Sequence, residues 1–156
     1  MDQRLKSTMG NPLWRIQNLY KIRDKDKHLI PCRFNVAQKR AVALIEQQIK
    51  SGQPIRQFHL KARQLGFSTL FGLLYLDNTI FTPNCISAII AHKKESLGYI
   101  WEIIRLAHAT MFAPLKPKLI DDSKTTLSFG NNSKIMVSLG VQATALHNLH
   151  VSEYAY

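Results

Sequence analysis

Apolar residues recur at helical spacing from Asn35 onward and predict a helix over about residues 35–49. Asn35 is a residue type that caps first turns, and Gly52 follows the predicted end. Residues 69–80 are nearly all apolar, which predicts a buried helix, and residues 94–111 show the spacing of an amphipathic one. Three helices therefore account for much of the middle of the chain.

Shorter apolar runs predict strands between and after these helices. Residues 57–60 and 86–91 are two such runs, and the second is apolar enough to be buried on both faces of a sheet. Residues 125–129 and 134–139 alternate on either side of a Gly-Asn-Asn-Ser turn, which predicts a hairpin. A last apolar segment, residues 146–151, predicts a final strand.

The order of these elements is that of an α/β domain with a mostly parallel sheet. Residues 1–33 are mixed and polar, and we expect a poorly packed leader with one short helix between Trp14 and Tyr20. In open parallel sheets ligands bind at the carboxyl ends of the strands. The loop after Leu60 and the end of the last strand are therefore the places to look for a site.

Composition narrows the class of protein. The 156 residues are 46% hydrophobic and 20% charged, as in a globular domain. The formal charge of +11 favours a polyanionic partner such as nucleic acid or nucleotide phosphate, although a solvated basic surface has the same composition. No apolar run is long enough for a membrane span or signal core, and the two cysteines lack metal-ligand spacing. We therefore expect a cytoplasmic protein with reduced thiols.

The loop of residues 61–69 partly matches the phosphate-loop pattern G-x-x-x-x-G-K-[ST]. Gly66 and Ser68 fall in register with the second glycine and the hydroxyl residue. Lys61 takes the place of the first glycine, and Phe67 takes the place of the usual lysine. The pattern alone is therefore a weak match.

The physical chemistry of a strand-to-helix loop favours keeping this match. Such a loop directs backbone N–H groups and the positive end of the helix dipole at one point. Gly66 permits a close approach to phosphate, Ser68 offers a hydroxyl to Mg²⁺, and Lys61 or Arg63 can supply the missing cation. The alternative is an ordinary basic loop in which Ser68 is the helix N-cap.

A carboxylate follows the last predicted strand. Glu153 comes directly after Ser152, and a nucleotide hydrolase needs an acidic residue at such a place to orient the attacking water. A solvated glutamate at the end of a strand is the alternative interpretation. The occurrence of Glu153 about 85 residues after a candidate phosphate loop favours the interpretation as a nucleotide hydrolase.

Four segments in this order resemble the ATPase motifs of phage terminase large subunits. Lys61–Thr69 (KARQLGFST) resembles their deviant Walker A loop, and Leu149–Tyr156 (LHVSEYAY) resembles their Walker B segment. Phe34–Gln38 resembles the upstream adenine-contacting motif, and Thr126–Ile135 is similar to the hairpin between the two ATP motifs. The resemblance covers about residues 34–156.

The resemblance implies a site for ATP and Mg²⁺. Gln38 would recognise adenine, Lys61 and Arg63 would neutralise phosphate charge, and Gln64, Leu65 and Gly66 would lend backbone N–H groups. Ser68 and Thr69 would bind Mg²⁺ and phosphate, Ser152 would contact the metal indirectly, and Glu153 would polarise the water.

The same resemblance implies a P-loop NTPase fold of the ASCE type that stops after the Walker B strand. Residues 34–156 would form an incomplete ATPase domain, without the coupling motif and the nuclease domain of large terminases. We expect such a chain to be a fragment or the product of a truncated or split gene, poorly stable or oligomeric by itself, with little ATPase activity. A cooperative melt and normal turnover of the purified chain would contradict this expectation.

A terminase motor translocates double-stranded DNA into a procapsid. The partners implied are that DNA, a portal protein, a terminase small subunit and further copies of the chain in a ring, in the cytoplasm of an infected or lysogenic bacterium. One alternative is a helicase-like ATPase, which Phe67 and Ser152 argue against. Another is a non-enzymatic basic module that binds DNA and carries vestigial ATP motifs.

Overall fold

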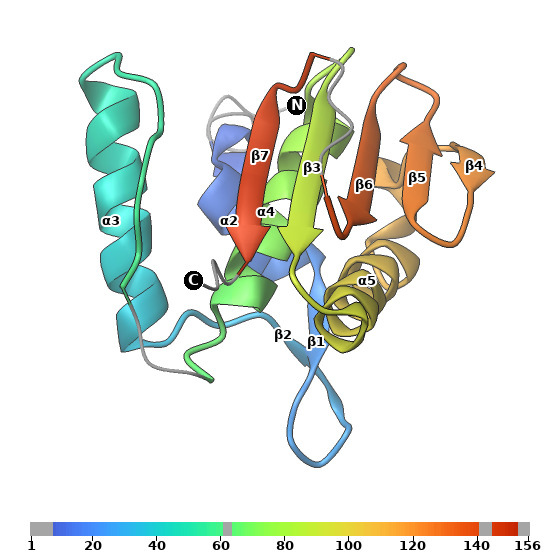
Figure 1. Ribbon diagram of the computed structural model, residues 1–156, viewed down its shortest axis with the longest axis horizontal. Coiled ribbons are helices and arrows are strands. Elements are labelled where there is room, and N and C mark those ends of the chain that lie inside the picture. Colours follow the sequence, from blue (N-terminus) through green and yellow to red (C-terminus); the bar gives the residue numbers. More distant parts are fainter. Residues whose placement is uncertain (1–7, 61–63, 141–144, 153–156) are drawn as a thin grey trace.

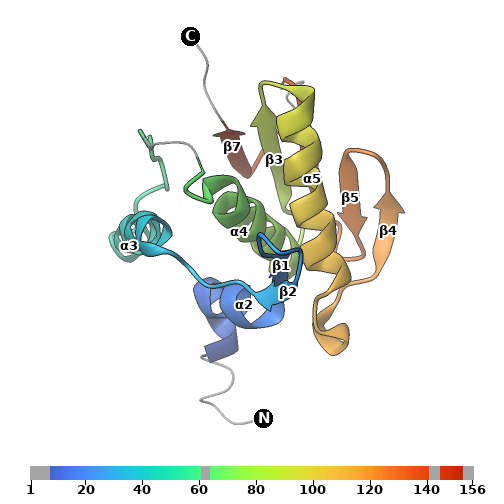
Figure 2. The same ribbon diagram turned by 90° about the horizontal axis from the view of Figure 1, so that it is seen from below.

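The structure is a computed structural model that describes residues 8–60, 64–140 and 145–152. These residues form an α/β fold around a five-stranded sheet with the strand order β4-β5-β6-β3-β7 (Figures 1 and 2). The strands are β4 (Leu119–Asp122), β5 (Thr126–Phe129), β6 (Lys134–Ser138), β3 (Ile86–Ala91) and β7 (Asn148–Ser152). The helices are α2 (Pro12–Leu19), α3 (Val36–Lys50), α4 (Phe67–Phe81), α5 (Lys94–Ala109) and the short 3-10 helix η1 (Ala113–Leu115).

The sheet is mixed. β3 runs parallel to both β6 and β7, whereas β4, β5 and β6 form an antiparallel meander. The predicted hairpin of β5 and β6 is confirmed, as are the strands β3 and β7 and the helices α2, α3, α4 and α5. β4 was not expected, and it makes the sheet less parallel than the sequence predicted. Within the described residues, no helix has the length and apolar character needed to span a membrane.

The core lies between the sheet and two helices that pack side by side on it. α4 contacts α5, α2, β3 and β6, which explains why almost every face of this helix is apolar. Leu70, Leu73 and Leu76 of α4 are completely buried, as are Ile89 of β3 and Ile104 of α5. Burial of this kind stabilises by about 1.5–3 kcal/mol for each large aliphatic side chain.

Within the described part of the N-terminal segment, residues 12–20 are packed on this core, so the expectation of a poorly packed leader is wrong there. Ile16 of α2 is fully buried, and Tyr20 is 1% exposed. Arg15 bonds the buried carboxylate of Asp77 on α4, with 2.6 Å between Nη2 and Oδ2. The hydroxyl of Tyr20 donates to the same carboxylate at 3.0 Å. After α2, the hairpin of β1 (Lys21–Arg23) and β2 (Leu29–Pro31), also not expected, contacts α5 and α2.

The predicted strand at residues 57–60 is not formed. These residues are described and carry no regular structure, and Phe58 and Leu60 are 90% and 104% exposed. In Figure 1 the segment runs down beside α3, on the open side of β7. A short apolar run becomes a strand only where a neighbour completes its hydrogen bonds. In the described residues β7 pairs with β3, and residues 57–60 pair with no strand.

The two edges of the sheet differ in how well they are protected against pairing with another chain. β4 carries Asp121 and Asp122, and its register with β5 is interrupted by an irregularity after Leu119. Charges and bulges of this kind discourage edge-to-edge association. β7 has no charged residue and an unbroken register with β3, and its Leu149 and Val151 are 47% and 41% exposed. β7 is therefore the edge at which we expect the chain to associate.

Replacing Val151 with lysine is expected to weaken self-association of the purified chain about fivefold, because a charge on an edge strand discourages pairing with another chain and an unfavourable cross-strand pair costs up to ~1 kcal/mol. The measurement is the dissociation constant by sedimentation velocity. Ile120→Lys is the matched control, since Ile120 is 65% exposed on the protected β4 edge. Equal effects of both substitutions would show that β7 is not the associating edge.

Candidate functional site

The candidate site begins at the N-terminus of α4. Gly66 is the N-cap, in the left-handed region with φ of 71°, and the helix begins at Phe67. Ser68 is the second residue of the helix, so the alternative in which Ser68 caps it is wrong. In the part of the chain that is described, no side chain caps this helix. The positive end of the α4 dipole therefore lies at this point, and the N–H groups of Ser68 and Thr69 belong to the first turn.

The end of β7 meets this helix start. The hydroxyl oxygens of Ser68 and Ser152 lie 3.5 Å apart, although 84 positions separate them in the chain. Ser152 is 7% exposed and is paired in register with Ala91, the last residue of β3. The start of α4 and the carboxyl ends of β3 and β7 thus share one edge of the sheet, which is where ligands bind in α/β folds.

The first turn of α3 holds the loop in front of α4. The amide Nε2 of Gln38 donates to the carbonyl of Gly66 at 2.7 Å, and Nδ2 of Asn35 donates to the carbonyl of Leu65 at 3.1 Å. The same two side chains form the capping box of α3: Asn35 accepts from the backbone N–H of Gln38, and Gln38 accepts from that of Asn35. One pair of amides therefore both starts α3 and fixes the loop.

Gly66 is required by this arrangement for two reasons. Its φ of +71° lies where side chains other than glycine are strained. A Cβ at this position would also lie 2.8 Å from Nε2 of Gln38. The close approach of the loop to α3 thus depends on the absence of a side chain.

Aromatic rings hold β7 against α4 next to the site. Phe71 of α4 stacks on the imidazole of His150 with 4.5 Å between ring centroids, and it also contacts His59 at 5.5 Å. Tyr75, one turn further along, donates from its hydroxyl to the carbonyl of Leu149 at 2.8 Å. Burial raises the pKa of Tyr75 to about 12, which keeps this hydroxyl protonated at neutral pH. The end of β7 is thereby placed by side chains of α4 as well as by pairing with β3.

The remaining members of the expected site are only partly described. Lys61, Arg63 and Glu153 lie outside the described residues. Gln64 is exposed, with φ of 62°. Thr69 lines a cavity of about 670 Å³ with Tyr99 of α5, among other residues. Among the expected residues, the structure therefore brings together the pairs Ser68 with Ser152 and Gln38 with Gly66.

Sequence reasoning missed the part that Asn35 plays in the loop. It identified Asn35 as a helix cap and Gln38 as a reader of adenine. The spacing N-x-x-Q is that of a capping box, which already predicts that the glutamine side chain folds back on its own helix. The bonds to Leu65 and Gly66 join residues 30 and 28 positions apart, and no local pattern predicts them.

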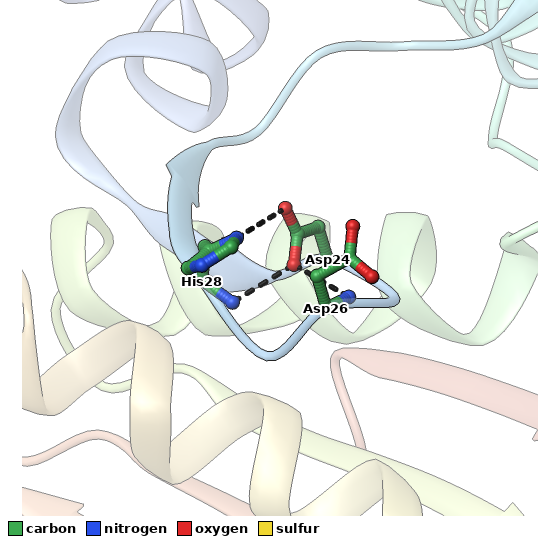
Figure 3. A group of neighbouring side chains, drawn as sticks. All are labelled: Asp24, Asp26 and His28. Atoms are coloured by element: carbon green, nitrogen blue, oxygen red, sulfur yellow. Dashed lines mark hydrogen bonds and ion pairs between the residues drawn. The ribbon is translucent and has the colours of Figure 1, made fainter.

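A second cluster of polar side chains lies in the turn between β1 and β2. Figure 3 shows Asp24, Asp26 and His28, whose ligand atoms all lie within 4.8 Å of one another. Oδ1 of Asp24 accepts from the backbone N–H groups of Asp26 and His28, at 2.9 and 2.8 Å. These bonds are those by which an aspartate closes a turn. The cluster is thus explained by the hairpin itself.

The fold and this edge together define an α/β protein in which the N-terminus of α4 meets the carboxyl end of β7. Comparison of the sequence with protein-family models gave no match, and comparison with curated proteins gave none either. The function is therefore inferred from the residues of the chain.

Proposed function

We propose that the chain is the ATP-binding part of a DNA-packaging motor of the terminase type, with the triphosphate of Mg·ATP bound at the start of α4. The contact between Ser68 and Ser152 is the observation that carries the proposal. It joins the two segments that resemble Walker A and Walker B, as one triphosphate site requires. The N-terminus of α4 supports the proposal because the positive end of the helix dipole favours an anion.

The two serine hydroxyls are of a kind that Mg²⁺ can bind, since this ion prefers oxygen ligands. Ser68 would hold the ion directly, and Ser152, whose Oγ lies 3.5 Å from that of Ser68, would act through a bound water. When bound, Mg²⁺ would neutralise charge on the β- and γ-phosphates.

The other roles in this proposal belong to the loop before α4 and to Glu153. Lys61 and Arg63 would neutralise phosphate charge, and Glu153 would orient the attacking water. Gln64, Leu65 and Gly66 supply backbone N–H groups. The net charge of +11 supports a double-stranded DNA partner, whose phosphates attract basic surfaces. A portal protein, a small subunit and further copies of the chain complete the proposed motor.

Replacing Lys61 with alanine is expected to weaken Mg·ATP binding about 10- to 100-fold, because a charge-assisted hydrogen bond contributes about 1.5–3 kcal/mol. Isothermal titration calorimetry measures the affinity. Lys124→Ala is the control, since Lys124 is an exposed lysine in the turn between β4 and β5. Wild-type affinity in the Lys61 variant would contradict the proposed phosphate site.

A non-enzymatic DNA-binding module is the second candidate, and the same charge of +11 supports it. The two functions differ in what the purified chain binds. DNA binding that falls steeply with salt, in a chain without affinity for Mg·ATP, would favour the module over the motor.

A further inference from the structure

The amide of Gln38 is committed to the chain itself. Its Oε1 accepts from the N–H of Asn35 at 2.9 Å, and its Nε2 donates to the carbonyl of Gly66 at 2.7 Å. The residue is 5% exposed. A glutamine that reads a nucleotide base needs both amide atoms facing the base edge. Oε1 and Nε2 can each make one more hydrogen bond, but the side chain is buried, so Gln38 would have to move away from Asn35 and Gly66 to turn this edge toward a base.

Asn35 makes a parallel contact beside it. Its Oδ1 accepts from the N–H of Gln38, and its Nδ2 donates to the carbonyl of Leu65. Two amides from one helix turn therefore hold the carbonyls of two consecutive loop residues. With these carbonyls turned toward α3, the left-handed turn at Gly66 is fixed and the first N–H groups of α4 are set in direction.

We infer that Asn35 and Gln38 are positioning residues for the loop before α4, and that the site recognises a triphosphate without selecting adenine through Gln38. The second part rests on the proposed function, because it takes a triphosphate as the ligand. The first part concerns the ligand-free chain and is tested separately.

Two nearly isosteric substitutions remove the bonds to the loop while keeping the cap of α3, and each adds a carboxylate charge. Gln38→Glu keeps an acceptor for the N–H of Asn35 but loses the donor to Gly66, and Asn35→Asp keeps the cap of α3 but loses the donor to Leu65. Glutamate at the third position and aspartate at the N-cap both favour helix starts. α3 is therefore expected to stay folded in both variants. Gln47→Ala is the control, on an exposed position of the same helix.

Hydrogen exchange of the ligand-free chain tests the positioning role. Amide exchange over residues 64–70 is expected to accelerate about tenfold in Gln38→Glu and Asn35→Asp, the upper range for one lost hydrogen bond. Exchange within residues 40–50 of α3 is expected to stay at the wild-type rate, and Gln47→Ala is expected to change neither. Unchanged exchange over residues 64–70 in both variants would overturn the positioning role.

Ligand affinity tests the second part, with Gln38→Met as the variant because it adds no charge that would repel phosphate. Its affinities for Mg·ATP, Mg·GTP and Mg·tripolyphosphate are each expected to fall by the same factor, about tenfold. A loss confined to Mg·ATP would show that Gln38 reads the base and would overturn the inference. If the wild-type chain binds none of the three, the proposed function and this second part both fail, and the exchange experiment still decides the positioning role.

Discussion

Replacing Arg15 with methionine is expected to lower the free energy of unfolding by about 3–5 kcal/mol at pH 7, because it leaves a buried carboxylate without its cation. Asp77 is fully buried and accepts four hydrogen bonds, three from Arg15 and one from Tyr20, with lengths between 2.6 and 3.1 Å. After the substitution, only the Tyr20 hydroxyl would remain of these. Denaturant unfolding of the variant and the wild type measures the difference.

Arg105→Met is the matched control for this prediction. Arg105 pairs with Asp122 at 2.8 Å, but both side chains are more than 40% exposed. An exposed pair contributes about 0–1 kcal/mol, so the control is expected to change stability by less than ~1 kcal/mol. Equal losses in the two variants would mean that burial of Asp77 does not determine the effect.

The cost of Arg15→Met is expected to shrink as the pH falls. Burial raises the pKa of Asp77, and Arg15 opposes that rise. Without Arg15, the folded-state pKa of Asp77 rises further above its unfolded value of about 3.9. The folded variant then holds a proton that the unfolded chain has released, so stability is lost as the pH rises through the folded pKa. A stability difference between variant and wild type that is independent of pH would contradict this.

Replacing Gly66 with alanine is expected to cost about 2–3 kcal/mol of stability and to weaken any triphosphate binding. The left-handed conformation costs about 1–2 kcal/mol for a residue with a Cβ. The remainder comes from displacing Gln38, whose Nε2 would lie 2.8 Å from that Cβ. Thermal unfolding and calorimetric titration measure the two effects.

Gly52→Ala is the control that separates the cost of backbone strain from the cost of the close contact with Gln38. Gly52 has φ of +68°, close to the +71° of Gly66, but a Cβ there would have no atom within 4 Å. The control is therefore expected to lose only the ~1–2 kcal/mol of strain and to keep its affinity for triphosphate. Equal losses in both variants would mean that the loop tolerates displacement of Gln38.

The sequence predicted elements with local hydrogen bonds more accurately than elements whose hydrogen bonds reach distant segments. α3, α4 and α5 were placed within a few residues because helix hydrogen bonds are local and the apolar stripe marks the buried face. The strand predicted at residues 57–60 was wrong, and β4 was missed. The hydrogen bonds of a strand are made with a second strand, and the local sequence does not show which segment that is.

The predictions for the candidate site also differ in accuracy for this reason. The sequence correctly placed Ser152 at the end of a strand. It placed Gly66 and Ser68 in a loop between a strand and a helix, but the strand at residues 57–60 is not formed and Ser68 lies inside α4. It assigned Gln38 to a base, whereas the structure shows that this amide bonds Asn35 and Gly66. Residues 61–63 and 153–156 lie outside the description, so the roles of Lys61, Arg63 and Glu153 stay predictions.

By itself, the sequence determined the helices α3, α4 and α5 and the hairpin of β5 and β6, because each depends on residues within a few positions. Only the tertiary structure decided that Ser68 meets Ser152, that α3 holds the loop and that Arg15 neutralises Asp77. Those contacts join residues 28 to 84 positions apart. They form only when burial of the apolar faces brings the elements together, so no local pattern encodes them.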